Sequence, residues 1–202
     1  MQPLRKNIPT HSVLGVKCRS MSEFKPHLRL DFGERCAYCG DGDSIAGSTR
    51  NFQVDHFAPK SKFPDLEFEY GNLMYACPYC NRAKWDYWVG EDAKVCVDGD
   101  KGIVNPCTPE YDEHLGRLES GAIVAKTPLG WFMYNRLKLY LRRHHLFYKL
   151  ERLKERIDVL RHCGKCEELV YLYDALTTYY QLSNTIDNRE GVRIARQDVP
   201  PG

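Results

Sequence analysis

The sequence has no long hydrophobic run, no internal repeat and little excess of charge. No uninterrupted apolar stretch approaches the roughly 18 residues that a membrane-spanning helix requires. The first six residues lack the apolar character of a secretory signal, so we expect a cytoplasmic protein without a membrane partner. The formal net charge of +2 is too small to identify a polyanionic ligand, and only local clusters of charge bear on that question.

Cysteine, in contrast, is plentiful. Nine cysteines are present, and in a reducing compartment Cys-x-x-Cys pairs are more often metal ligands or redox groups than disulfides. Cys36/Cys39 and Cys77/Cys80 are two such pairs. Zn²⁺ binds four thiolates tetrahedrally, so the two identical spacings predict one structural Zn²⁺ site. Four unrelated buried thiols or a redox pair remain as alternatives. A catalytic zinc is disfavoured, because four thiolates leave no position open for water.

A third pair, Cys163 and Cys166, follows much later in the chain. A second zinc site there needs further ligands, because two thiolates do not fill a tetrahedral shell. Cys96, Cys107 or His114 can supply them only if the intervening chain folds back onto this pair. The sequence alone leaves a second metal site open.

Polar residues of a particular order lie between and just after the first two pairs. The stretches are Cys36-Ala37-Tyr38-Cys39-Gly40, Val54-Asp55-His56-Phe57-Ala58-Pro59, Gly71-Asn72-Leu73 and Ala76-Cys77-Pro78-Tyr79-Cys80-Asn81-Arg82-Ala83-Lys84. This order resembles the HNH endonucleases, which have a treble-clef, ββα-metal core. The resemblance covers about a quarter of the chain. Because several elements match in order, it is far more specific than a single Cys-x-x-Cys pair.

The resemblance implies a role for each matched polar residue. His56 would be the general base that activates water, since an imidazole with an ordinary pKa of about 6.5 suits proton removal at neutral pH. A backbone carbonyl on the facing strand is the expected partner that sets its tautomer. Asp55 and Asn81 would hold a catalytic Mg²⁺ or Mn²⁺ ion, which prefers oxygen ligands. Asn72 would brace the loop between the strands and so aim His56. Asn81 stands where many relatives carry histidine.

The pattern predicts an α+β fold, a small zinc-stabilised ββα-metal (HNH) module with a mainly α-helical C-terminal extension. We divide the chain into an N-terminal arm (1–34), the HNH nuclease module (35–90), a loop-rich linker (91–129) and a helical extension (130–202). Expected elements are a helix over 21–30, strands over 51–57 and 72–75, a helix over 78–88, a hairpin around 120–121, a long helix over 131–162 broken once, and a helix over 167–182.

Basic and aromatic residues offer candidate contacts to nucleic acid. Ten basic and three acidic residues lie between Trp131 and Lys165, so we expect Arg142 and Arg143 to bind nucleic acid, although a solvated helix face explains the charges equally well. Lys84 would either contact phosphate or shape its helix face. The remaining candidates are aromatic and histidine side chains. We expect Trp85, Tyr87 and Trp88 to form a small core with Phe57 and Tyr75, with base stacking as the lesser alternative, and His144 and His145 to lie at the surface or on phosphate.

These features together predict a metal-dependent endonuclease that hydrolyses phosphodiester bonds, with DNA favoured by the resemblance. A non-catalytic zinc-binding adaptor for nucleic acid or protein, and an HNH nuclease that cleaves RNA or tRNA, are the alternatives. Asn105-Pro106-Cys107, Glu113-His114 and Gly121, followed by a helical tail, also resemble the standalone HNH proteins of bacterial anti-phage systems of the Septu type or linked to retrons. That resemblance implies an ABC/SMC-like ATPase as partner protein.

Overall fold

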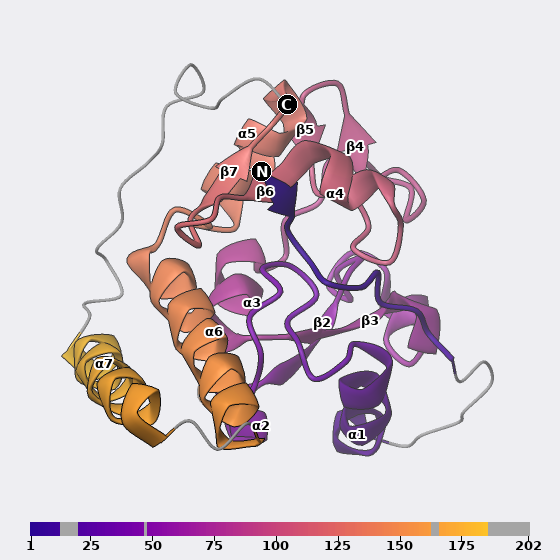
Figure 1. The fold of residues 1–202 in the computed structure, drawn as a ribbon. Helices are drawn as coiled ribbons and strands as arrows, with labels where there is room; N and C mark the ends of the chain where they lie inside the picture. Colours follow the sequence, from indigo (N-terminus) through magenta and orange to yellow (C-terminus); the bar gives the residue numbers. More distant parts are fainter. Residues whose placement is uncertain (13–19, 47, 163–165, 186–202) are drawn as a thin grey trace.

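A short antiparallel hairpin followed at once by a helix forms the centre of the motif-bearing region. The computed structural model describes residues 1–12, 20–46, 48–162 and 166–185. Strand β2 (Gln53–His56) pairs with β3 (Leu73–Ala76), and helix α3 (Pro78–Lys84) follows (Figure 1). Both strands confirm the expected positions. In the pairing register Asp55 lies opposite Met74 and His56 opposite Leu73, so the two polar residues end the first strand.

Helix α3 begins where the sequence predicts and ends earlier. Pro78 occupies its first turn, and the Cys77 sulfur caps the helix by accepting a hydrogen bond from the Cys80 backbone N–H at 3.4 Å. The predicted end at residue 88 is wrong. The helix stops at Lys84, because Trp85 adopts a left-handed backbone conformation with φ 54° and ψ −136°.

Helix α1 (Met21–Asp31) confirms the first predicted helix and packs against β2 and β3 (Figure 1). Its side chains Phe24 and Leu28 are fully buried. The helix thereby covers the hairpin and supplies apolar area that a hairpin of two four-residue strands lacks on its own.

The expected loop-rich linker carries short regular elements and contributes to the core. The buried side chains of Tyr111, Leu115 and Ile123 join the same apolar cluster as the hairpin. Strand β1 of the N-terminal arm completes a three-stranded antiparallel sheet in the order β1-β6-β7, and the predicted hairpin around residue 121 is confirmed. The elements are β1 (Gln2–Pro3), β4 (Val97–Asp98), β5 (Lys101–Gly102), α4 (Glu110–His114), β6 (Leu115–Arg117) and β7 (Ile123–Ala125). The division of the chain into four segments stays a prediction.

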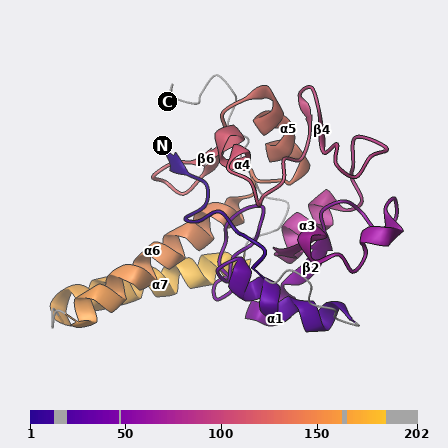
Figure 2. The same ribbon diagram turned by 90° about the vertical axis from the view of Figure 1, so that its right-hand side faces the viewer.

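The C-terminal part is helical, as expected. The predicted long helix with one break is confirmed as helices α5 (Pro128–Arg136) and α6 (Arg142–His162), and α7 (Cys166–Thr185) follows. Lys138, with φ 55°, lies in the break between α5 and α6. Figure 2 shows α6 and α7 side by side, projecting from the rest of the molecule. Among the described helices, none combines the length and apolar character needed to cross a membrane. The side chains of the Cys163/Cys166 pair lie outside the described residues.

The observed fold is therefore a mixed α and β structure with small strands and a helical C-terminal region. Three short elements complete it, namely the helix α2 (Ser48–Asn51) and the 3-10 helices η1 (Pro64–Leu66) and η2 (Tyr70–Asn72). Both 3-10 helices lie in the connection between β2 and β3, so they shape the loop that faces the end of the first strand.

Candidate active site

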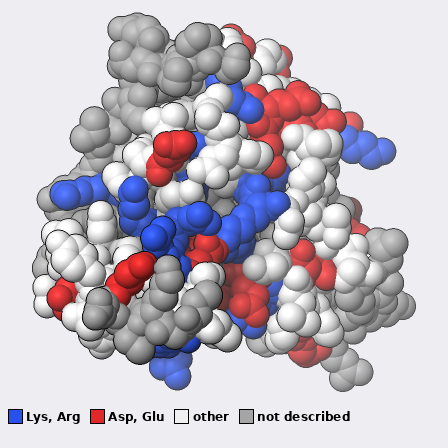
Figure 3. All heavy atoms as spheres, in the orientation of Figure 1, with Lys and Arg blue, Asp and Glu red and all other residues white. Residues whose placement is uncertain are grey.

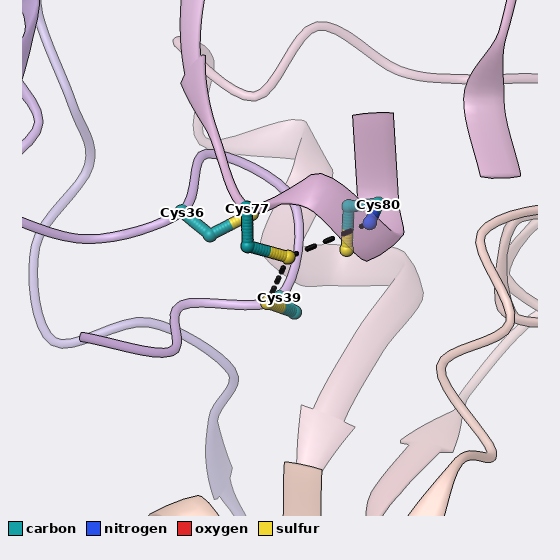
Figure 4. Close-up of side chains that lie close together, drawn as sticks. All are labelled: Cys36, Cys39, Cys77 and Cys80. Atoms are coloured by element: carbon teal, nitrogen blue, oxygen red, sulfur yellow. Dashed lines mark hydrogen bonds between the residues drawn. The ribbon is translucent and has the colours of Figure 1, made fainter. Parts of the chain in front are cut away.

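Four buried cysteine sulfurs converge at the start of α3. The sulfur atoms of Cys36, Cys39, Cys77 and Cys80 all lie within 4.8 Å of one another (Figure 4). The Cys39 and Cys77 sulfurs are 3.9 Å apart. A tetrahedral zinc with Zn–S bonds of about 2.3 Å requires sulfur separations of about 3.8 Å. The four side chains fit one tetrahedral ion, so the predicted set of ligands is brought together.

The charge of the cluster also favours a bound cation. Burial raises the pKa of the Cys39 thiol well above its usual range, and the neighbouring Cys36 side chain raises it further. Four thiolates in a buried site repel one another, so their ionisation requires a compensating positive charge. The cluster can hold a metal ion, and its donor set is the one that zinc prefers.

Residues far along the chain hold the first cysteine pair in place. The Ala37 backbone N–H donates to the carbonyl of Tyr75 at 2.8 Å, which fixes the pair against β3. The Tyr111 hydroxyl donates to the carbonyl of Tyr38, and the Arg117 guanidinium donates to that of Cys39, each at 2.8 Å. The segment over residues 91–129 therefore buttresses the cysteine cluster.

His56 lies at the end of β2, where its imidazole makes one defined hydrogen bond. Its Nε2 lies 3.0 Å from the carbonyl oxygen of Glu67. A carbonyl oxygen only accepts, so in the neutral ring Nε2 carries the proton and Nδ1 has the free lone pair. A backbone carbonyl as partner was expected. Its expected location on the facing strand is wrong, because Glu67 lies in the connection between the strands, between η1 and η2, before β3 begins.

Asn72 ties this connection together through its side chain. Its Oδ1 accepts a hydrogen bond from the Ala58 backbone N–H at 2.8 Å, and its Nδ2 donates to the carbonyls of Ala58 at 3.0 Å and Leu66 at 3.3 Å. Leu66 immediately precedes the residue whose carbonyl holds His56. The expected bracing hydrogen bonds to the backbone are therefore present, and they position the loop against which His56 rests.

Asp55 is buried and engages two side chains. The Tyr38 hydroxyl donates to Oδ2, and the Lys84 ammonium lies 3.3 Å from Oδ1 and 3.2 Å from Oδ2. Lys84 also donates to the carbonyl oxygen of His56 at 2.7 Å and is fully buried. The expectation that Lys84 contacts nucleic acid is therefore wrong. Its ammonium reaches inward to Asp55, because the side chain lies on the face of α3 that packs on β2.

Asn81 faces the same cavity as Asp55 and His56. Its Nδ2 donates to Gln53 Oε1 at 2.6 Å, which leaves its amide oxygen as an available ligand. The three residues line an open cavity of about 480 Å³, together with Lys60, Arg82 and Trp85. Asp55 Oδ1 and the Asn81 amide oxygen are hard donors that suit Mg²⁺ or Mn²⁺. The donor types of these two residues therefore suit the expected divalent ion.

The basic helix differs from the prediction at two residues. Arg143 is buried, with its guanidinium over the rings of Tyr79 and Phe147. His144 is also buried, and its Nδ1 lies 2.6 Å from Asp41 Oδ2. A surface role for these two side chains is therefore wrong. The first turn of α6 packs on the cysteine-bearing loop, so the side chains of Arg143 and His144 point inward. Arg142 remains exposed.

Other basic side chains do reach the surface near this helix. Lys and Arg side chains gather across the middle of the face drawn in Figure 3. A hollow of about 280 Å³ lies between the N-terminal arm and α6, and its lining includes the exposed Arg152, the half-buried Arg35 and the buried Arg117. Arg35 and Arg152 are paired with Glu151 and Glu155, respectively, so part of this positive charge is already neutralised.

The aromatic residues after α3 divide into two groups. Trp88 is buried and makes an edge-to-face contact with Phe57, so this part of the expected small core is confirmed. Tyr75 instead stacks on Phe52. Trp85 is 69% exposed, and its expected place in the core is wrong.

Two groups that hold the site were not singled out from the sequence. Tyr38 lies between the first two cysteines, and its hydroxyl contacts Asp55 only because the cysteine-bearing loop packs on β2. The Glu67 carbonyl carries no side-chain signal at all. Spacing within the motif gives no indication of either contact.

The chain is similar to one protein family model and to curated proteins of one kind. Residues 36–86 match the family model described as HNH endonuclease. A Septu protein PtuB from Bacillus mycoides (strain KBAB4) is 28% identical over 120 residues, which cover 49% of this chain and 40% of that protein. A Septu protein PtuB from Bacillus thuringiensis is 27% identical over 95 residues, covering 45% of this chain and 33% of that protein.

The chain therefore spans well under half the length of these curated relatives. No solved structure matches it. The matched family region contains both cysteine pairs, the two strands and α3, which are the elements that bring the cavity residues together. Residues 36–86 therefore resemble an HNH endonuclease domain, in a chain distantly similar to the PtuB proteins of Septu.

Proposed function

We propose that this chain is a metal-dependent endonuclease that hydrolyses phosphodiester bonds in DNA, with His56 as its general base. The observation that carries the proposal is the hydrogen bond from His56 Nε2 to the Glu67 carbonyl. It fixes the tautomer in which Nδ1 is the basic nitrogen, on a residue that lines the cavity with Asp55 and Asn81. In the described part of the chain, Nδ1 has no competing partner.

His56 accepts a proton from the water molecule that attacks phosphorus. The carbonyl of Glu67 holds the ring and stabilises the imidazolium once Nδ1 is protonated, since Nε2–H remains its donor. Asn72 keeps the connection carrying Glu67 in place. General-base catalysis of this kind contributes on the order of 10² to 10⁴ in rate.

Asp55 and Asn81 would hold the divalent cation of the reaction. When bound, Mg²⁺ or Mn²⁺ supplies Lewis-acid stabilisation of the negative charge that develops on the phosphate. Lys84 and Tyr38 orient the Asp55 carboxylate, while Gln53 orients the Asn81 amide so that its oxygen stays available. A zinc ion held by the four cysteines would have a structural role, since four sulfurs would complete its shell.

The similarity to Septu proteins supports a role as the nuclease component of a bacterial anti-phage defence system. By the same resemblance, its partner is an ABC/SMC-like ATPase. The exposed basic residues of α6, among them Arg142, add non-specific attraction to the nucleic acid backbone.

A plasmid-nicking assay with Mg²⁺ tests the reaction and the base together. The His56→Ala variant should lose at least roughly 100-fold in nicking rate while keeping its zinc content and melting temperature. His27→Ala is the matched control, because His27 is an exposed histidine of α1 outside the cavity. It should nick at the unaltered rate.

Two results would change the proposal. Undiminished nicking by folded His56→Ala would remove His56 as the base. Cleavage of tRNA but not of plasmid, abolished by the same substitution, would make RNA the substrate in place of DNA.

A further inference from the structure

Trp85 stands at the wall of the cavity that contains His56 and Asn81. It is the residue at which α3 ends, and its backbone N–H donates to the carbonyl of Asn81 at 2.8 Å. The side chain is 69% exposed although an indole is a large apolar group. In the described part of the chain its ring has no aromatic or cationic partner, whereas Tyr87 packs on Phe132 and carries Arg136 over its face.

The backbone at Trp85 makes this exposure more informative. Its φ of 54° lies in the left-handed region, which bulky residues rarely occupy and which glycine adopts without strain. Neither core packing nor helix termination requires a tryptophan here. The conformation turns the chain away from α3 and leaves the indole beside the cavity. The strained backbone of Trp85 therefore holds an exposed aromatic ring next to the candidate base.

Although Asp55 and Asp86 also line the cavity, its exposed cations suit the backbone of a nucleic acid strand. Lys60 and Arg82 are both exposed and line the same cavity as Trp85. Lys60 pairs with Glu67 at 2.6 Å, while Arg82 projects from α3 one turn before the tryptophan. Cationic side chains beside an exposed aromatic ring are the combination that binds the backbone and bases of single strands.

We propose that Trp85 is a stacking platform for an unpaired nucleobase next to the scissile phosphate. The inference rests on the proposed nuclease function and narrows its substrate to single-stranded or locally unpaired DNA. Bases in an intact duplex already stack on their neighbours and offer the indole no free face. A base that stacks on Trp85 positions the adjoining phosphate toward His56 and the side-chain oxygens of Asp55 and Asn81.

Binding measurements on the 202-residue chain separate this role from catalysis. All variants carry His56→Ala, so that no probe is cut. The probes are fluorescein-labelled DNA oligonucleotides of about 16 nucleotides, one single-stranded and one fully paired. Trp85→Gly should weaken single-strand binding by roughly 5- to 150-fold, the loss expected for one stacked base, and leave duplex binding unchanged. Trp85→Phe should restore most of the affinity.

Glycine is the informative replacement because it accepts a φ of 54° without strain. Zinc content and melting temperature should therefore be maintained. Tyr171→Ala is the matched control, because Tyr171 is an aromatic residue of α7 that is 84% exposed and does not line the cavity. It should bind both probes like the parent.

An abasic nucleotide stepped along the single strand locates the stacked base. At one position it should weaken binding by the parent as much as Trp85→Gly does, and cause no further loss in Trp85→Gly. Equal affinity of the parent and Trp85→Gly for the single strand would overturn the inference. The exposed indole would then be assigned to contact with a partner protein. Equal losses on single strand and duplex would also overturn the inference.

These results are distinguishable from a failure of the nuclease proposal. Plasmid nicking by the unaltered chain, combined with binding that does not depend on Trp85, contradicts the stacking platform alone. Single-strand binding that depends on Trp85, without nicking or cutting of any nucleic acid, contradicts the nuclease proposal alone.

Discussion

The ammonium of Lys84 lies 3.2 Å from the Asp55 carboxylate and 2.7 Å from the carbonyl oxygen of His56. One buried cation therefore ties together the two residues of the Asp-His dipeptide. Burial raises the pKa of the Asp55 carboxyl above its usual range, although the charge of Lys84 acts in the opposite direction. The pair connects α3 to the end of β2, so the geometry of the cavity depends on it.

Replacing Lys84 by methionine should destabilise the fold and impair cleavage. It leaves Asp55 as a buried acid without its cation, and breaking a buried pair in this way costs about 3–5 kcal/mol. The free energy of unfolding from denaturant titration measures this loss. The double variant Lys84→Met/Asp55→Asn should recover part of the stability, because no unpaired charge remains, but not the nicking activity. A Lys84→Met variant with unaltered stability would contradict the pairing.

Removing one cysteine of the cluster should release the metal and unfold the domain. A structural zinc supplies on the order of 10 kcal/mol to a small fold, so Cys77→Ser should lower both the zinc content and the melting temperature sharply. Cys96→Ser is the control, since Cys96 lies outside the cluster. Elemental analysis of the unaltered chain should give about one zinc per chain. A value near two would instead favour a second site, such as one at Cys163 and Cys166.

The thiol of Cys107 should make stability depend on pH in the alkaline range. Burial raises its pKa to about 12, whereas an unfolded thiol has a pKa of about 8.5. The folded state thus keeps a proton that the unfolded state releases. The stability from this group is full below about pH 8.5 and declines as the pH rises toward 12. The difference in unfolding free energy between the unaltered chain and Cys107→Ala should therefore shrink over that range.

Alkylation gives an independent check on Cys107. In the folded chain at pH 8 this thiol should react with iodoacetamide far more slowly than the thiols of the denatured chain, because the thiolate is the nucleophile. Fast reaction of Cys107 in the folded state would contradict the raised pKa.

The amino-acid sequence determined the parts of the site that depend on short-range spacing. Three local patterns are of this kind: the two residues between paired cysteines, the proline after Cys77, and the Asp-His pair at the end of a short strand. They predict a turn, a helix start and a strand end, respectively, without reference to the path of the rest of the chain. The family resemblance then indicated which side chains belong together. The strands, the start of α3 and the cysteine cluster accordingly appear where they were predicted.

Only the tertiary structure decided how the polar side chains are partnered and which of them face solvent. Lys84 and Arg143 have the same charge as exposed basic residues, yet both turn inward, because α3 packs on β2 and α6 packs on the cysteine-bearing loop. The carbonyl that holds His56 and the exposure of Trp85 depend on backbone positions that carry no side-chain signal. Burial and pairing are properties of contacts between distant segments, so residue type and spacing alone cannot specify them.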